Sequence, residues 1–220
     1  MKVLIIAPHP DDEVLGCGGI IAKNVACGNE VYVGVITKAC EPIFSEAFDQ
    51  ENKKHCLKAH KLLNVKETFF LDFPAAMLDG VAKHELNAAV ASLIRKLAPE
   101  EVYIPHRGDM HLDHKLTSDA CMVALRPRND YSVKRVYAYE TLSETEWDIP
   151  NSTNAFIPNV YVDISDYIDL KIEAMKEYKK QLCEYPDPRS IEAIKALAML
   201  RGSTISKEYA ESFMLIREIK

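Results

Sequence analysis

The sequence of 220 residues predicts an α/β protein with a mostly parallel β-sheet and helices on both faces. Two observations predict this fold class. Short runs rich in β-branched residues alternate with segments of helical pattern, which is typical of parallel strands joined by crossover helices. The first run, residues 2–7 (KVLIIA), is apolar after its lysine, as expected of a strand buried on both faces.

The first third of the chain supplies two strand–helix units. The first strand is followed by a loop over residues 8–14 and by a helical pattern over 15–27, which ends at Gly28-Asn29, a common helix stop. A second strand is predicted over residues 30–37 (EVYVGVIT) and a second helix over 46–63.

The rest of the chain continues the alternation with shorter strands. Strands are predicted over residues 68–71, 101–104, 133–139 and 159–164, and helices over 83–97, 112–125, 166–183 and 189–200. Phe73-Pro74 and Pro105 interrupt the pattern, residues 126–130 form a turn-rich connection, and residues 141–158 are irregular. The order of elements is Rossmann-like, and we expect one domain over residues 1–220.

Composition narrows the class of protein. Apolar residues make up 48% of the chain, charged residues 27%, and the net charge is −6, which argues against a general nucleic-acid or acidic-membrane binder. The six cysteines form no CxxC pair, no signal peptide is visible, and no apolar run approaches the roughly 20 residues that span a bilayer. We therefore expect a cytoplasmic protein without a membrane span or a nucleic-acid partner.

The loop after the first strand concentrates one imidazole and three carboxylates in His9-Pro10-Asp11-Asp12-Glu13. Acids at the end of a buried strand need a compensating cation, because unpaired charges are costly to desolvate. His9 and Asp12 are spaced so that a tight loop can direct both at one zinc ion, and Asp11 could face the metal's water as a general base. The alternative is a solvated acidic turn that caps the next helix.

A second group of ionisable residues follows the strand that ends at Pro105. The segment Gly108 to His114 (GDMHLDH) contains two histidines and two acids. Either His111 or His114 could supply a third zinc ligand, and the other could act as a general acid or stabilise an oxyanion, with Asp113 orienting it. The alternative is a helix N-terminus with exposed histidines.

Other motifs favour structural roles. Gly16, Gly18 and Gly19 suggest a dinucleotide loop only weakly, because the preceding acids would repel a pyrophosphate, and close helix packing is the preferred interpretation. The sequence has no GxSxG nucleophile motif, and Cys17 fits a small packing residue. The remaining histidines, His55, His60, His84 and His106, have surface or packing roles as the default interpretation, although His106 lies in the loop after the fourth strand and is kept as a weak candidate for the site.

The two motifs together resemble the PIG-L/LmbE-like family of zinc-dependent N-acetylglucosaminyl deacetylases. Residues 8–13 (PHPDDE) match its first signature, and residues 111–114 (HLDH) match its second, usually HPDH. The resemblance implies that His9, Asp12 and His114 bind Zn²⁺, with other divalent metals such as Fe²⁺ possible. It also implies that Asp11 is the general base, and that His111 stabilises the oxyanion or protonates the amine with Asp113 as its orienting partner.

The resemblance further implies an activity, a substrate class and an assembly. The expected enzyme is a metal-dependent N-deacetylase, a hydrolase that acts on the linear amide of an N-acetylated amino sugar, and a homo-oligomer (trimer or hexamer) is expected. Many members carry a substrate-contacting arginine early in the second helix, whereas residues 46–54 (EAFDQENKK) contain none. Another metal-dependent amidase or esterase, or a non-catalytic metal-binding module, remains the alternative.

Overall fold

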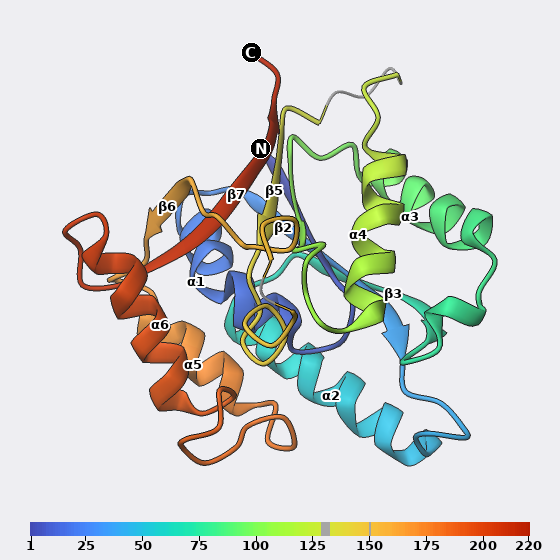
Figure 1. Ribbon diagram of the computed structural model, residues 1–220, viewed down its shortest axis with the longest axis horizontal. Coiled ribbons are helices and arrows are strands. Elements are labelled where there is room, and N and C mark those ends of the chain that lie inside the picture. Colours follow the sequence, from blue (N-terminus) through green and yellow to red (C-terminus); the bar gives the residue numbers. More distant parts are fainter. Residues whose placement is uncertain (129–132, 150) are drawn as a thin grey trace.

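The computed structural model of the chain describes residues 1–128, 133–149 and 151–220 (Figure 1). Its strands are β1 (Lys2–Ala7), β2 (Glu30–Lys38), β3 (Glu67–Pro74), β4 (Glu101–Pro105), β5 (Arg135–Tyr139), β6 (Val160–Asp163) and β7 (Ala210–Glu218). Its helices are α1 (Asp12–Ala26), α2 (Glu46–Leu62), α3 (Lys83–Leu97), α4 (Leu112–Ala124), α5 (Ile168–Lys176) and α6 (Ile191–Ser203), with a 3₁₀ turn η1 (Leu78–Gly80).

All seven of these strands form one sheet in the order β3-β2-β1-β4-β5-β7-β6. Strands β1 to β5 are parallel, whereas β7 runs antiparallel to both β5 and β6. The chain moves outward from β1 to β3 and then returns to place β4 on the other side of β1. This switch in strand order lies between β1 and β4, where open α/β sheets bind their ligands. The predicted fold class is confirmed.

Helices cover both faces of the sheet, as predicted (Figure 1). Alternate residues of β1 face opposite sides, as the pleat of a strand requires. Val3 and Ile5 join one core cluster with residues of α1, α2, α5 and α6. Leu4 and Ile6 join the other with residues of α3 and α4. Burial on both faces explains why β1 is a continuous apolar run rather than an alternating one.

The glycines of α1 let the helix lie close to its neighbours. A Cβ atom on Gly16 would be 2.2 Å from Cδ2 of Tyr139 in β5, and one on Gly19 would be 2.7 Å from side-chain atoms of Ile164. Both distances are far shorter than a van der Waals contact. The interpretation of these glycines as packing residues is therefore confirmed, and the close approach fixes the N-terminal end of α1 at the edge of the sheet.

Several predicted boundaries differ from the structure. Helix α1 begins at Asp12, three residues before the predicted start, because the loop turns sharply at Asp11 (φ 123°). Strand β3 continues through Phe73-Pro74, because it is an edge strand, where a missing N–H is tolerated. Helix α5 ends at Lys176 instead of residue 183.

Strand β7 was not predicted from the sequence. Of the turn predicted over residues 126–130, residues 129 and 130 lie outside the described part of the chain. The start of β7 is difficult to recognise in the sequence because its buried residues include Glu211, and glutamate has a low β-strand propensity. No helix in the described ranges is long and apolar enough to span a membrane.

Candidate metal centre and active site

The two acid- and histidine-rich segments meet at one edge of the sheet. Strands β1 and β4 pair directly and in parallel, so the chain leaves both strands on the same side. His9 and Asp12 follow β1, and His114 lies in the first turn of α4, which follows β4. The two loops lie together because adjacent parallel strands place their carboxyl ends side by side.

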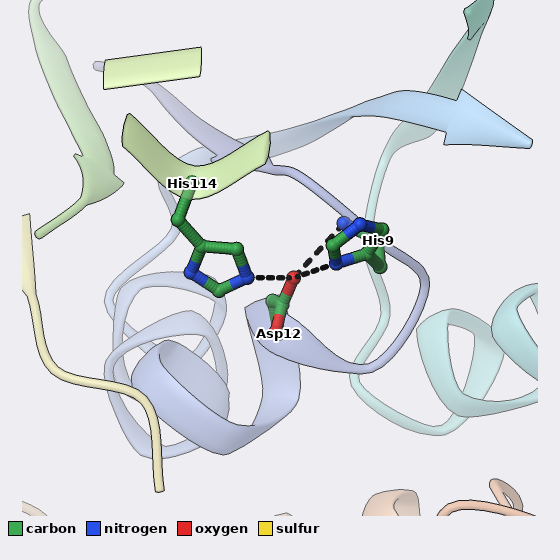
Figure 2. Close-up of side chains that lie close together, drawn as sticks. All are labelled: His9, Asp12 and His114. Atoms are coloured by element: carbon green, nitrogen blue, oxygen red, sulfur yellow. Dashed lines mark hydrogen bonds and ion pairs between the residues drawn. The ribbon is translucent and has the colours of Figure 1, made fainter. Parts of the chain in front are cut away.

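His9, Asp12 and His114 each direct one potential ligand atom toward the same point (Figure 2). These atoms lie within 4.8 Å of one another. Oδ2 of Asp12 is 3.3 Å from Nδ1 of His9 and 3.2 Å from Nε2 of His114. The Asp12 and His114 side chains are fully buried, and that of His9 is 21% exposed, so the group opens to solvent only on the His9 side.

Two buried atoms of this group have no hydrogen-bond partner, namely Oδ1 of Asp12 and Nε2 of His114. Buried polar atoms are almost always paired, and an unpaired one costs free energy. Nε2 of His114 faces a carboxylate oxygen at 3.2 Å, so an unprotonated ring places two electron-rich atoms opposite each other. A divalent cation resolves both features, and the residues present therefore fit a metal centre.

A carboxylate holds the outer nitrogen of each histidine. Nδ1 of His114 is 2.8 Å from Oδ2 of Asp109, and Nε2 of His9 is 3.0 Å from Oδ2 of Asp113. An ionised carboxylate can only accept hydrogen bonds, so these ring nitrogens donate. In the neutral rings, Nε2 of His114 and Nδ1 of His9 then carry the lone pairs that face Asp12, which is the usual orientation of a metal-binding histidine.

The same carboxylates favour the charged imidazoles when no cation is bound. Burial lowers the pKa of His114, but the Asp12 and Asp109 carboxylates outweigh it and raise that pKa to about 10. Burial also lowers the pKa of His9, but the Asp113 and Asp12 carboxylates outweigh burial and raise that pKa to about 9. The site thus attracts positive charge strongly, and metal binding must displace protons from these rings.

Asp11 lies beside the three candidate ligands in a strained conformation. Its φ of 123° is rare for any residue except glycine. Its main-chain N–H donates to Oε2 of Glu13 at 3.1 Å, and its Oδ2 accepts a hydrogen bond from Nη1 of Arg189 at 2.6 Å. Burial raises the pKa of Asp11 to about 7 although Arg189 opposes the rise. A carboxyl group with a pKa near neutrality is suited to general-base work.

His111 lies at the start of α4, with its ring centroid 4.6 Å from that of His9. Its Nδ1 accepts a hydrogen bond from the main-chain N–H of Asp113 at 3.1 Å, so the neutral ring carries its proton on Nε2. Burial and the neighbouring His9 lower the pKa of His111 to about 4. Asp113 contacts His111 through its main-chain N–H, and its carboxylate is hydrogen-bonded to His9. The role of Asp113 as the orienting partner of His111 stays a prediction.

Comparison with known families adds the decisive observation. A family model described as PIG-L, GlcNAc-PI de-N-acetylase, matches residues 4–125, more than half of the chain. The chain belongs to the PIG-L family. The match includes both sequence motifs and the three candidate metal ligands, so the resemblance inferred from the sequence is confirmed.

Similar proteins extend the PIG-L match to nearly the whole chain. Diacetylchitobiose deacetylase of Thermococcus kodakarensis is 27% identical over 243 residues, which cover 98% of this chain and 83% of the relative. The conserved protein TT1542 from Thermus thermophilus has a TM-score of 0.81 at 28% identity, and the match covers 99% of this chain and 96% of that protein. N,N'-diacetylchitobiose deacetylase from Pyrococcus horikoshii has a TM-score of 0.79 at 25% identity, and the match covers 98% of this chain and 83% of that protein.

These PIG-L matches confirm the predicted class of enzyme, an N-deacetylase of the hydrolase class. The fold alone would not establish that reaction, because 4-carboxy-2-hydroxymuconate hydratase, at 18% identity and a TM-score of 0.78, shares the fold. The catalytic conclusion therefore rests on the family match and on the constellation of ionisable residues described above.

A cavity of about 250 Å³ opens beside these candidate metal ligands. His9, Asp11 and His111 line it on the side of the candidate ligands. Phe44 and Phe48, whose stacked rings lie 5.4 Å apart, also line it. Polar contacts are offered by further lining residues: Asn52, Glu144, Lys180, Gln181 and Arg189. The cavity thus combines an aromatic wall with polar groups, as small-molecule sites commonly do.

Several residues of this PIG-L site were not recognised from the sequence. Arg189 was placed at the start of a helix, yet its guanidinium contacts Asp11, which is 178 positions earlier in the chain. His60 is buried, which agrees with a packing role, and its Nε2 lies 3.0 Å from Oε1 of Glu13, a partner that the sequence does not reveal. Asp109 was noticed within its motif without a role. Of these three residues, only Asp109 could have been recognised from the nearby sequence, because it lies close to His114 and a metal-binding histidine usually has a carboxylate partner.

Proposed function

We propose that this chain hydrolyses the acetamido group of an N-acetylated amino sugar of the N-acetylglucosamine type, using Zn²⁺ held by His9, Asp12 and His114. The observation on which the proposal depends is the convergence of three ligand atoms within 4.8 Å, two of them belonging to residues with unpaired buried atoms. Two imidazoles and one carboxylate form a typical catalytic zinc set that leaves a position open. Fe²⁺ accepts the same ligand types.

The chemistry that such a cation supplies when bound is polarisation of the amide carbonyl and a lowered pKa of water. The protein's contribution begins at Asp11, whose carboxylate takes a proton from the attacking water. Its pKa near 7 lets it accept that proton and later give it to the departing amine at neutral pH. Arg189 Nη1 fixes the orientation of the carboxyl group by its hydrogen bond to Oδ2.

His111 acts as a hydrogen-bond donor rather than as the main proton source. Its Nδ1 is occupied by the N–H of Asp113, which leaves Nε2–H as the group that can donate in the neutral ring. Its lowered pKa keeps the ring neutral at physiological pH. A donor fixed beside the cavity stabilises the negative charge that develops on the carbonyl oxygen in the transition state.

The substrate class is supported by the relatives and by the cavity. The similar proteins named above include two diacetylchitobiose deacetylases. The stacked rings of Phe44 and Phe48 offer an apolar wall for one face of a sugar ring, and Arg189 and Gln181 offer polar contacts to hydroxyl groups. We further propose that residues 1–220 act as one domain, since strands from both ends of the chain join one sheet. A cytoplasmic location and a trimeric or hexameric assembly stay predictions.

The test is a screen of N-acetylated hexosamines, free and as glycosides, with mass spectrometry following the loss of one acetyl group. We expect acetate release with the Zn²⁺-loaded protein, its loss after chelation, and its return on adding Zn²⁺ or Fe²⁺. The matched control is the same protein loaded with metal but carrying Asp11→Asn. Release of phosphate or of an alcohol from esters, without acetate release from any sugar, would instead indicate a different metal-dependent hydrolase.

A further inference from the structure

We propose that Glu13 is a positioning residue that holds the main chain of Asp11 in its strained conformation. Among the three acids of the first motif, Glu13 is the one to which the proposed reaction assigns no role. The inference rests on the proposed function in one respect, namely that Asp11 is the general base. The geometry that points to Glu13 involves a buried group of four side chains, Glu13, His60, Thr68 and Tyr178, here termed the Glu13 cluster.

Asp11 adopts φ 123° and ψ −32° immediately before α1. A side chain makes this backbone region costly, and a residue persists there only when its surroundings enforce it. The main-chain carbonyl of Asp11 accepts the first bonds of α1, from Val14 and Leu15 at 3.0 and 2.9 Å. Its N–H donates to Oε2 of Glu13 at 3.1 Å. Glu13 therefore supplies the contact that secures the preceding peptide.

Glu13 can hold that peptide because its own carboxylate is fixed. Its Oε1 lies 3.0 Å from Nε2 of His60 and accepts a hydrogen bond from the hydroxyl of Tyr178. Nδ1 of His60 lies 2.6 Å from Oγ1 of Thr68. Glu13 and Tyr178 are fully buried, and His60 is 3% exposed. The cluster thus ties the start of α1 to α2, to β3 and to the segment after α5.

The Glu13 cluster is not well suited to hold a metal of its own. Glu13, His60 and Cys56 do have ligand atoms within 4.8 Å of one another. However, both oxygens of Glu13 and both nitrogens of His60 already contact polar atoms in the protein. The unpaired buried atoms that mark the metal centre occur at Asp12 and His114 instead. A hydrogen-bonded clamp accounts for the observed contacts, whereas a cation would break them.

The first test separates positioning from general destabilisation through enzyme kinetics. Glu13→Met keeps the length of the side chain and removes the acceptor, whereas Glu13→Gln keeps an oxygen for the Asp11 N–H. We expect Glu13→Met to lower kcat by about tenfold or more with KM and metal content near wild type, because a small displacement of a catalytic group is enough. Glu13→Gln should restore most of kcat. Equal losses in the two variants, or a change in KM alone, would overturn the proposal.

The second test needs no activity, so it remains decisive even if the proposed reaction is wrong. Asp11→Gly and Asp11→Ala remove the same carboxylate and differ only in the Cβ that φ 123° disfavours. With Glu13 present, we expect the glycine variant to have a Tm about 2–4 °C higher than the alanine variant. In the Glu13→Met background, or in Tyr178→Phe if Glu13→Met does not fold, the difference should shrink or reverse. An unchanged difference would show that Glu13 does not hold this peptide.

Discussion

At the scale of single residues, the proposed function gives Asp11 and His114 separable tasks, although both are buried beside Asp12. We propose His114 as a metal ligand through Nε2, whereas the carboxyl group of Asp11 is held by Arg189. Replacement of each should therefore impair a different property. His114→Ala should lose the metal, and with it the activity. Asp11→Asn should keep the metal and lose turnover by about 100-fold or more, since it retains shape but cannot accept the proton.

Metal content by mass spectrometry and turnover, measured on the same preparations, check this pair of variants. Each variant is the control for the other, because both remove one ionisable group from the same buried site. Full metal occupancy in His114→Ala would contradict the ligand assignment. Normal turnover in Asp11→Asn would contradict the assignment of the general base.

At the scale of elements, carboxylates at the start of α4 hold the two histidines that we propose as metal ligands. Asp109 precedes the helix and holds His114, and Asp113 in its first turn holds His9. Asp113 also accepts hydrogen bonds from the main chain of Ala76 at 2.6 Å and Leu78 at 3.4 Å, so the segment after β3 is tied to the same carboxylate. One short stretch therefore links three loops at the carboxyl edge of the sheet.

We predict that Asp109→Asn weakens metal affinity by about 10- to 100-fold, because loss of the carboxylate partner weakens the histidine ligand and loosens its orientation. Affinity is measured by competition with a chromogenic chelator. Asp119→Asn is the matched control, because Asp119 lies on α4 but is half-exposed and pairs with Arg107 on the surface. An unchanged affinity in Asp109→Asn would contradict the role given to this carboxylate.

At the scale of the whole molecule, a buried ion pair and the hydrogen bonds of its carboxylate join the antiparallel strand β7 to α5 and α1. Glu211 in β7 lies 2.7 Å from Nζ of Lys171 in α5, and both side chains are 5% exposed. The same carboxylate accepts hydrogen bonds from the main-chain N–H groups of Gly19 and Ile20, each at 2.7 Å. Glu211 therefore joins the antiparallel strand to α1, the helix that begins at the candidate ligand Asp12.

Replacing Glu211 by leucine should lower the free energy of unfolding by about 3–5 kcal/mol, because it leaves the Lys171 ammonium buried without its partner. Urea denaturation measures this loss. Adding Lys171→Met to the same chain should recover part of the stability, since the second change removes the unpaired charge. A single variant as stable as the wild type would contradict the importance of this ion pair.

Sequence reasoning was most successful where the physical cause was local. The apolar run of β1 predicts a strand buried on both faces, and the spacing of His9 and Asp12 predicts that their side chains approach each other, which they do at 3.3 Å. The contacts of Arg189 with Asp11, and of His60 and Tyr178 with Glu13, join residues from 47 to 178 positions apart. Such partners are set by the packing of α2, α5 and the segment before α6, for which a single sequence has no local pattern.

The strand β7 was missed for a related reason. Its charged Glu211 is buried only because Lys171 and the N–H groups of α1 surround it, and those neighbours are known only once the fold is known. The predicted length of α5 was wrong for a similar reason. A helical pattern continues past Lys176, but the chain turns there and Tyr178 enters the core, where its hydroxyl contacts Glu13.

The most direct test of the metal centre is anomalous diffraction at the zinc absorption edge from crystals grown with Zn²⁺. The account predicts one strong peak bounded by Nδ1 of His9, the carboxylate of Asp12 and Nε2 of His114. A peak at the Glu13, Cys56 and His60 group instead, or no peak between His9 and His114 at full zinc loading, would contradict it.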